Sequence, residues 1–124
     1  YQKAIEYYDK ALQITKDKLG ENHVSVAMSY NNLGIVYRNL GEYQKAIEYY
    51  DKDLQITKDQ LGENHVDVAT SYNNLGAVYD RLGEYQKAIE YYDKALQIRK
   101  DKLGEDHPET KRTLNNMSIV KSKL

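Results

Sequence analysis

The sequence repeats itself with a period of 42 residues. Residues 1–42 and 43–84 are identical at 35 of 42 positions, and a third copy matches the first at 21 of 23 positions from Tyr85 through His107. A period of this length indicates a solenoid, because one repeat cannot bury its own apolar face and must stack on the next. We therefore expect a single repeat domain over 1–124, with copies at 1–42, 43–84 and 85–124.

Each copy contains two helical segments separated by the tripeptide Leu-Gly-Glu. Glycine is favoured just past a helix C-terminus, and the single proline, Pro108, stands where a helix is expected to begin. Apolar residues recur with the helical period, and nothing alternates with a period of two over strand length. The sequence predicts an all-α fold of six antiparallel helices, at about 1–18, 23–40, 43–60, 65–82, 85–102 and 107–123.

Composition excludes several classes of protein. The 18 Lys and Arg against 19 Asp and Glu give a net charge of -1, so no bulk field attracts nucleic acid or an anionic membrane. Without cysteine there is no disulfide framework, thiolate metal site or thiol nucleophile. No apolar run is long enough for a signal peptide or a membrane span. Because the sequence opens at Tyr1 rather than Met, we expect a fragment of a longer protein.

Two motifs recur at fixed spacing within the copies. Tyr30-Asn31-Asn32-Leu33-Gly34 is followed by Tyr37, and Gly41-x-Tyr43 is followed by Ala46-Ile47 and Tyr50. This pattern resembles the tetratricopeptide repeat. The extra residues Lys-Asp-x-Leu-Gly-Glu-x-His resemble the 42-residue variety found in kinesin light chains. The resemblance implies a right-handed α–α superhelix that acts as a protein-interaction module, without a cofactor.

Three positions depart from the repeated pattern. Asp53 replaces the alanine that the other copies have, at a position that packs between helices in the family. Because burying its charge would cost several kcal/mol, we expect Asp53 at an exposed edge. In the last helix, Ser118 and Lys121 stand where the first copy has glycine and tyrosine. We expect the helix at 107–123 to be a degenerate, solvent-facing cap.

The helix over 24–40 has two different faces at about 100° per residue. Its packed face is predicted to hold Val26, Tyr30, Leu33, Gly34, Tyr37 and Leu40. Five of the seven differences between the first two copies fall on the opposite face, beside asparagines that do not change. The resemblance places that face in a concave groove that binds an extended peptide, where asparagine amides can both donate and accept hydrogen bonds. The predicted groove residues are Met28, Asn31, Asn32, Ile35, Arg38, Asn39, Thr70, Asn73, Asn74, Ala77, Asp80, Arg81, Arg112, Asn115 and Asn116.

The predicted groove residues also admit other interpretations. Any single groove position could be a solvent-facing residue that drifts freely. A carboxylate-clamp specificity is not expected, because Asn31, Ile35, Asn73 and Ala77 occupy the positions where that clamp needs Lys or Arg. RNA binding requires a basic groove and ranks last, since Asp80 offsets the arginines.

No spacing brings together a nucleophile, a base and an orienting group, so we expect no enzyme. His23, His65 and His107 recur every 42 residues, which keeps them too far apart for one metal ion and suits them to helix starts. The terminal Ser122-Lys123-Leu124 matches a peroxisomal address. We expect a cytoplasmic protein, peroxisomal only if this tripeptide is a genuine native C-terminus.

The main alternative to peptide binding is self-association. Ile5, Tyr8 and Leu12 lie on a helix whose preceding partner is missing from the sequence, so we expect them to lack the cover that their equivalents at 47, 50 and 54 receive. Copies could stack end to end or exchange a helix. This alternative predicts a homodimer whose population rises with concentration.

Overall fold

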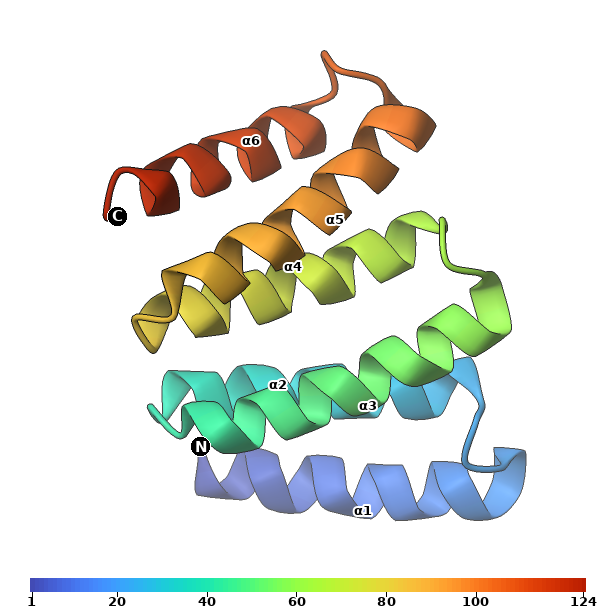
Figure 1. The fold of residues 1–124 in the computed structure, drawn as a ribbon. Coiled ribbons are helices and arrows are strands. Elements are labelled where there is room, and N and C mark those ends of the chain that lie inside the picture. Colours follow the sequence, from blue (N-terminus) through green and yellow to red (C-terminus); the bar gives the residue numbers. More distant parts are fainter. The chain divides into compact units, whose positions relative to one another are not determined.

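The computed structural model describes residues 1–124 and contains six α-helices and no strand (Figure 1). All six predicted helices are present, with bounds within two residues of those expected. None of them is both long and apolar enough to cross a membrane. The helices are α1 (Gln2–Leu19), α2 (Val24–Asn39), α3 (Tyr43–Leu61), α4 (Val66–Arg81), α5 (Tyr85–Leu103) and α6 (Pro108–Lys121).

Glycine and histidine set the helix bounds, as predicted. Gly20, Gly62 and Gly104 follow the last residues of α1, α3 and α5 with φ of 91°, 95° and 92°, a region in which a side chain would be strained. The three recurring histidines precede α2, α4 and α6. In each, Nδ1 accepts a hydrogen bond from the backbone N–H two residues on, at 3.0, 3.0 and 3.1 Å. These histidines are therefore N-caps.

The chain folds into two compact units, 1–62 and 63–124. In the first, α2 packs against both α1 and α3. In the second, α5 packs against both α4 and α6. The prediction of a single repeat domain over 1–124 is not tested by this division and stays a prediction. The buried core of the first unit includes Leu12, Val26, Ala27, Leu33 and Ile56, and that of the second includes Ala88, Tyr92, Leu96, Met117 and Val120.

Each unit brings a tyrosine ring against a helical glycine. A Cβ added at Gly34 would lie 2.7 Å from two ring carbons of Tyr50, and one added at Gly76 would lie 3.0 Å from the ring of Tyr92. Both distances are well inside van der Waals contact. The Leu-Gly pairs are therefore explained by packing, because any side chain here would displace the tyrosine that anchors the next helix.

Two expectations about packing were wrong. Leu40 was assigned to the packed face of α2 and is 39% exposed, whereas Ala27 and Val36 are buried although they were left off that face. The buried arc is wider than a single stripe because α2 has a neighbour on two sides. Leu40 lies just past the last residue of α2, as its C-cap.

Asp53 is the second correction. Its side chain was expected at an exposed edge, but the residue is only 7% exposed. The Thr57 hydroxyl, one turn on, donates a hydrogen bond of 3.1 Å to its carboxylate. The fully buried Ala95 occupies the same position in the third copy. The position is thus interior in both units, and a hydrogen bond offsets part of the cost of burying the charge.

Candidate functional site

The predicted groove residues lie on α2 in the first unit and on α4 and α6 in the second. All of them retain contact with solvent. Met28 on α2 is 63% exposed. The exposed members are Met28, Asn39, Thr70, Arg81, Arg112 and Asn115, and the half-buried ones are Asn31, Asn32, Ile35, Arg38, Asn73, Asn74, Ala77, Asp80 and Asn116.

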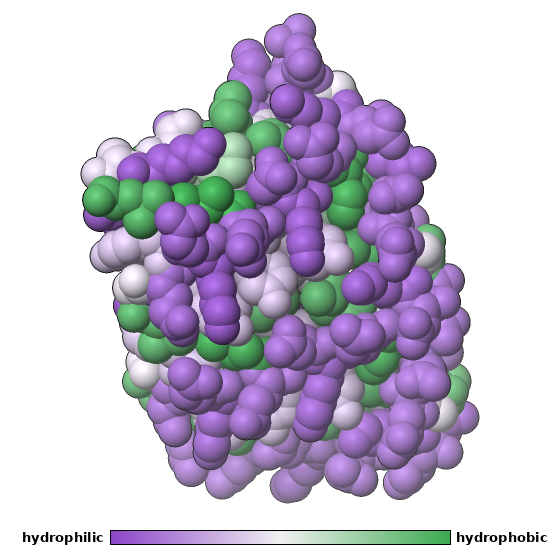
Figure 2. Space-filling model, viewed as in Figure 1, coloured by the Kyte–Doolittle hydropathy of each residue, from purple (hydrophilic) through white to green (hydrophobic).

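The tyrosines of the same helices lie on the packed side. Tyr30 is 7% exposed on α2 and Tyr72 is 9% exposed on α4. The predicted separation of a tyrosine-bearing packed face from an asparagine-bearing open face therefore holds within each unit. Hydrophilic residues cover most of the face drawn in Figure 2, with hydrophobic ones showing in separate groups between them.

Several groove side chains are held by polar contacts. The Arg38 guanidinium donates to the amide oxygen of Asn39 at 3.2 Å. The Lys123 ammonium donates to the Asp80 carboxylate at 2.9 Å, so a residue beyond α6 neutralises an acid on α4. The Asn73 amide oxygen is buried and accepts no hydrogen bond. The asparagines therefore differ in what they offer, since this oxygen is shielded from an approaching ligand.

Sequence reasoning missed Arg99, which the structure places between α4 and α6. The residue is only 5% exposed, and its guanidinium donates to the hydroxyls of Thr113 at 2.6 Å and Thr70 at 3.5 Å. Burial lowers the pKa of Arg99, and the Glu109 carboxylate at 3.5 Å acts in the opposite direction. The sequence contains a signal for this residue, because the third copy has arginine where the first two copies have threonine.

Aromatic rings and lysines form a second arrangement that the sequence did not reveal. The rings of Tyr37 and Tyr49 are stacked, with centroids 5.5 Å apart and planes 5° apart. Tyr79 and Tyr91 repeat this geometry in the second unit. Lys45 lies 5.1 Å from the ring centroid of Tyr37, within reach of a cation–π interaction. Partial burial, followed by the charge of neighbouring groups, raises the pKa of the Tyr49 hydroxyl.

A sequence profile of the tetratricopeptide repeat matches residues 1–56, 26–101 and 67–124, which together cover the chain. The chain belongs to the tetratricopeptide repeat family. No protein of curated function matches it in sequence. The tetratricopeptide repeat is generally a protein-interaction module and typically a non-catalytic scaffold.

Solved structures of kinesin-light-chain-like proteins share this tetratricopeptide fold. BtubC (BKLC) from P. vanneervenii matches with a TM-score of 0.87 and 30% identity over 94% of this chain. A putative kinesin light chain from Podosopora anserina with nearly identical repeats matches with a TM-score of 0.85 and 24% identity over 96%. The chain spans 47% and 56% of the lengths of these proteins. The predicted all-α solenoid of tetratricopeptide type is thereby confirmed.

Proposed function

We propose that this tetratricopeptide chain binds an extended peptide segment of a protein partner along the asparagine-bearing faces of its units. The observation that carries the proposal is the separation of faces within one helix. On α2, Tyr30 is buried, whereas Asn32 is only half-buried and Met28 is exposed. An extended peptide carries a donor and an acceptor at nearly every residue, and a side-chain amide can satisfy one of each.

The second unit supports the proposal independently. Arg99 of α5 donates hydrogen bonds to Thr70 on α4 and to Thr113 on α6, so both helices are tied to α5. A surface whose helices are held in place before binding loses less conformational entropy when a ligand binds. The residues that differ between α2 and α4, such as Ile35 and Ala77, would then contact different peptide side chains.

A peptide-display selection on the intact chain tests this proposal. Selected peptides are expected to bind more weakly, by about 1 kcal/mol for each lost hydrogen bond, when Asn32 and Asn74 are changed to Ala. Isothermal titration measures the change. The matched control changes Gln44 and Gln86 to Ala, which removes the same amide group from exposed positions on α3 and α5. If both double variants weaken peptide binding equally, or if neither weakens it, the peptide binds elsewhere on the chain.

Self-association through α1 is the second candidate function. The expectation that Ile5, Tyr8 and Leu12 lack cover was wrong, because Leu12 is 6% exposed and the other two pack against the same core, so other residues of α1 must carry this function. Tyr7 on α1 is 69% exposed and Ile14 is 55% exposed, whereas the equivalent Tyr49 lies against two tyrosine rings and the equivalent Ile56 is 6% exposed. An apolar strip of this kind favours contact with a second copy. Light scattering would then detect dimers whose population grows with chain concentration.

The residues on α6 limit how such copies could meet. Stacking α1 of one copy on α6 of another would place Tyr8 against Ser118, at the position where glycine meets the tyrosine ring in both units. Ser118 carries the Cβ that this contact excludes. A strict monomer at high concentration, or a dimer that survives Tyr7→Ser and Ile14→Ser, would eliminate association through α1.

A further inference from the structure

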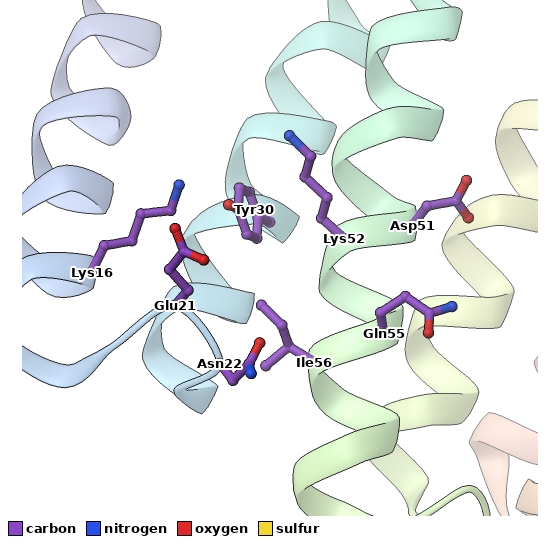
Figure 3. Close-up of a pocket in the computed structure, with 8 residues that line it drawn as sticks. All are labelled: Lys16, Glu21, Asn22, Tyr30, Asp51, Lys52, Gln55 and Ile56. Atoms are coloured by element: carbon purple, nitrogen blue, oxygen red, sulfur yellow. The ribbon is translucent and has the colours of Figure 1, made fainter.

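The first unit contains a cavity of about 340 Å³ away from the predicted groove. Figure 3 shows its walls, with α1 and the turn after it on one side and α3 on the other, and with Tyr30 of α2 between them. Tyr30 and Asn32 point roughly 160° apart around α2, so the cavity and the asparagine-bearing face lie on opposite sides of that helix. The residues that line it include Lys16, Glu21, Tyr30, Asp51, Lys52 and Ile56.

Two ammonium groups converge on one tyrosine ring in this cavity. The Lys16 nitrogen lies 5.6 Å from the centroid of Tyr30, and the Lys52 nitrogen lies 5.4 Å from it. The two lysines reach toward the ring from opposite walls (Figure 3). Hydrogen bonding to Tyr30 raises the pKa of Lys16 above its ordinary value. Lys52 also lies 5.5 Å from the ring of Tyr49, which gives it a second cation–π contact.

The remaining charges define what the cavity accepts. Two lysines and two acids line the cavity, so their formal charges cancel overall. At the Tyr30 ring itself, the two ammoniums are set against one carboxylate, that of Glu21, which acts electrostatically on Lys16. The Asp51 carboxylate points away from the Tyr30 ring (Figure 3). A ligand with one negative charge balances this surplus, whereas a phosphate dianion would be repelled by Glu21. The Tyr30 ring and the Ile56 side chain supply an apolar wall for a methylene stem.

We infer that this cavity binds a carboxylate on a methylene stem, as carried by the glutamate side chain of a partner peptide. Each ammonium has three donors and can direct one to the carboxylate while remaining near the tyrosine rings. The residues that line the cavity come from α1, α2 and α3, so a partner bound here would contact all three helices of the first unit. Binding at this cavity does not require the asparagine-bearing face and is independent of peptide binding there.

Titration followed by NMR of the lysine side chains tests the inference on the intact chain. The probe is the capped tripeptide acetyl-Gly-Glu-Gly-amide, and its glutamine counterpart lacks only the charge. Saturable chemical-shift changes are expected at Lys16 and Lys52 with the glutamate peptide but not with its glutamine counterpart. Propionate in a parallel arm tells whether the carboxylate and stem suffice without a peptide backbone. Inorganic phosphate forms the third arm.

Three variants sharpen this test. Lys52→Gln is expected to weaken binding roughly fivefold, the upper range for one exposed charge pair. Glu21→Gln should strengthen binding, because it removes the carboxylate that competes for Lys16. The matched control is Lys94→Gln, which removes the ammonium 5.5 Å from Tyr72 in the second unit and should leave the Lys16 shifts unchanged.

Four results would overturn the inference. These are shifts that do not saturate, equal shifts with the glutamine peptide, tighter binding of phosphate than of the glutamate peptide, and a Glu21→Gln variant that binds no better. The exposed Glu21 lies in a turn outside the helices, so its replacement keeps the test valid even if Lys52→Gln disturbs α3.

Discussion

The α2–α3 pair of the first unit and the α4–α5 pair of the second have nearly the same aromatic geometry but different polar interiors. The stacked tyrosines are 5.5 Å apart and 5° from parallel in both, and the tilted pairs are 6.0 Å apart in both. By contrast, α3 buries Asp53 where α5 has Ala95, and α5 buries Arg99 where α3 has Thr57. The shared tyrosines and glycines therefore fix how each pair packs, and the polar positions vary within that frame.

The largest expected effect would come from filling the glycine contacts. Gly34→Ala should lower the free energy of unfolding of the first unit by about 1–3 kcal/mol, because the new Cβ overlaps the Tyr50 ring and this exceeds the gain in helix propensity. Gly76→Ala should cost less, since its Cβ would lie at 3.0 Å rather than 2.7 Å from the ring. Amide hydrogen exchange in α2 and in α4 measures the two losses.

The double variant Gly34→Ala with Tyr50→Leu serves as the control for this comparison. If the ring is the obstacle, the alanine should cost less in that background than in the native chain. Equal costs at both glycines, or no cost at either, would mean that the tyrosine contacts do not fix the packing of each pair.

A smaller effect is expected from removing the polar difference in the second unit. Arg99→Thr restores the residue of the first two copies and removes the bond to Thr113, so exchange in α6 should quicken by an amount equivalent to about 1–2 kcal/mol. The desolvation that lowers the pKa of Arg99 offsets part of the loss. The control is Lys100→Thr, an exposed neighbour on α5, which should stay within about 0.5 kcal/mol of the native chain. Unchanged exchange in α6 would contradict the role assigned to Arg99.

The effect that is smallest at neutral pH is a loss of stability that appears only at high pH. Burial raises the pKa of Tyr92 from 10.0 to about 12, so the unfolded chain ionises this phenol while the folded chain keeps it protonated. The contribution of Tyr92 is therefore complete below pH 10 and declines as the pH rises toward about 12. Tyr92→Phe should flatten the fall in unfolding free energy over that range, as measured by urea titration at several pH values. The control is Tyr7→Phe on the exposed ring of α1, and an identical slope in both variants would refute the assignment.

The helix bounds were predictable because their determinants are local. The glycines and histidines act on backbone groups within two to four residues, so a linear pattern specifies them. The burial of the tyrosines and the greater exposure of the asparagines were also predictable, because the 3.6-residue period assigns them to opposite sides of one helix. Which of the exposed residues bind a partner stays a prediction.

The errors have different causes. Leu40 lies just past the last residue of α2, Asp53 is buried with a hydrogen bond from Thr57 on its own helix, and Arg99 was missed because its partners Thr70 and Thr113 lie on other helices. A periodic pattern gives the direction of a side chain and does not say how many neighbours lie in that direction. The cavity beside Tyr30 was likewise invisible, since Lys16 and Lys52 come from helices that meet only after folding.

By itself, the sequence determined the six helices, their ends and the side of each helix that packs, because these depend on period, caps and the absence of strand patterns. Only the tertiary structure decided which charges are buried and which lysines share a ring. Those outcomes depend on how closely helices that are far apart in the chain approach each other. A difference of a few ångströms in that approach decides whether a carboxylate is buried and whether two ammoniums lie near the same ring.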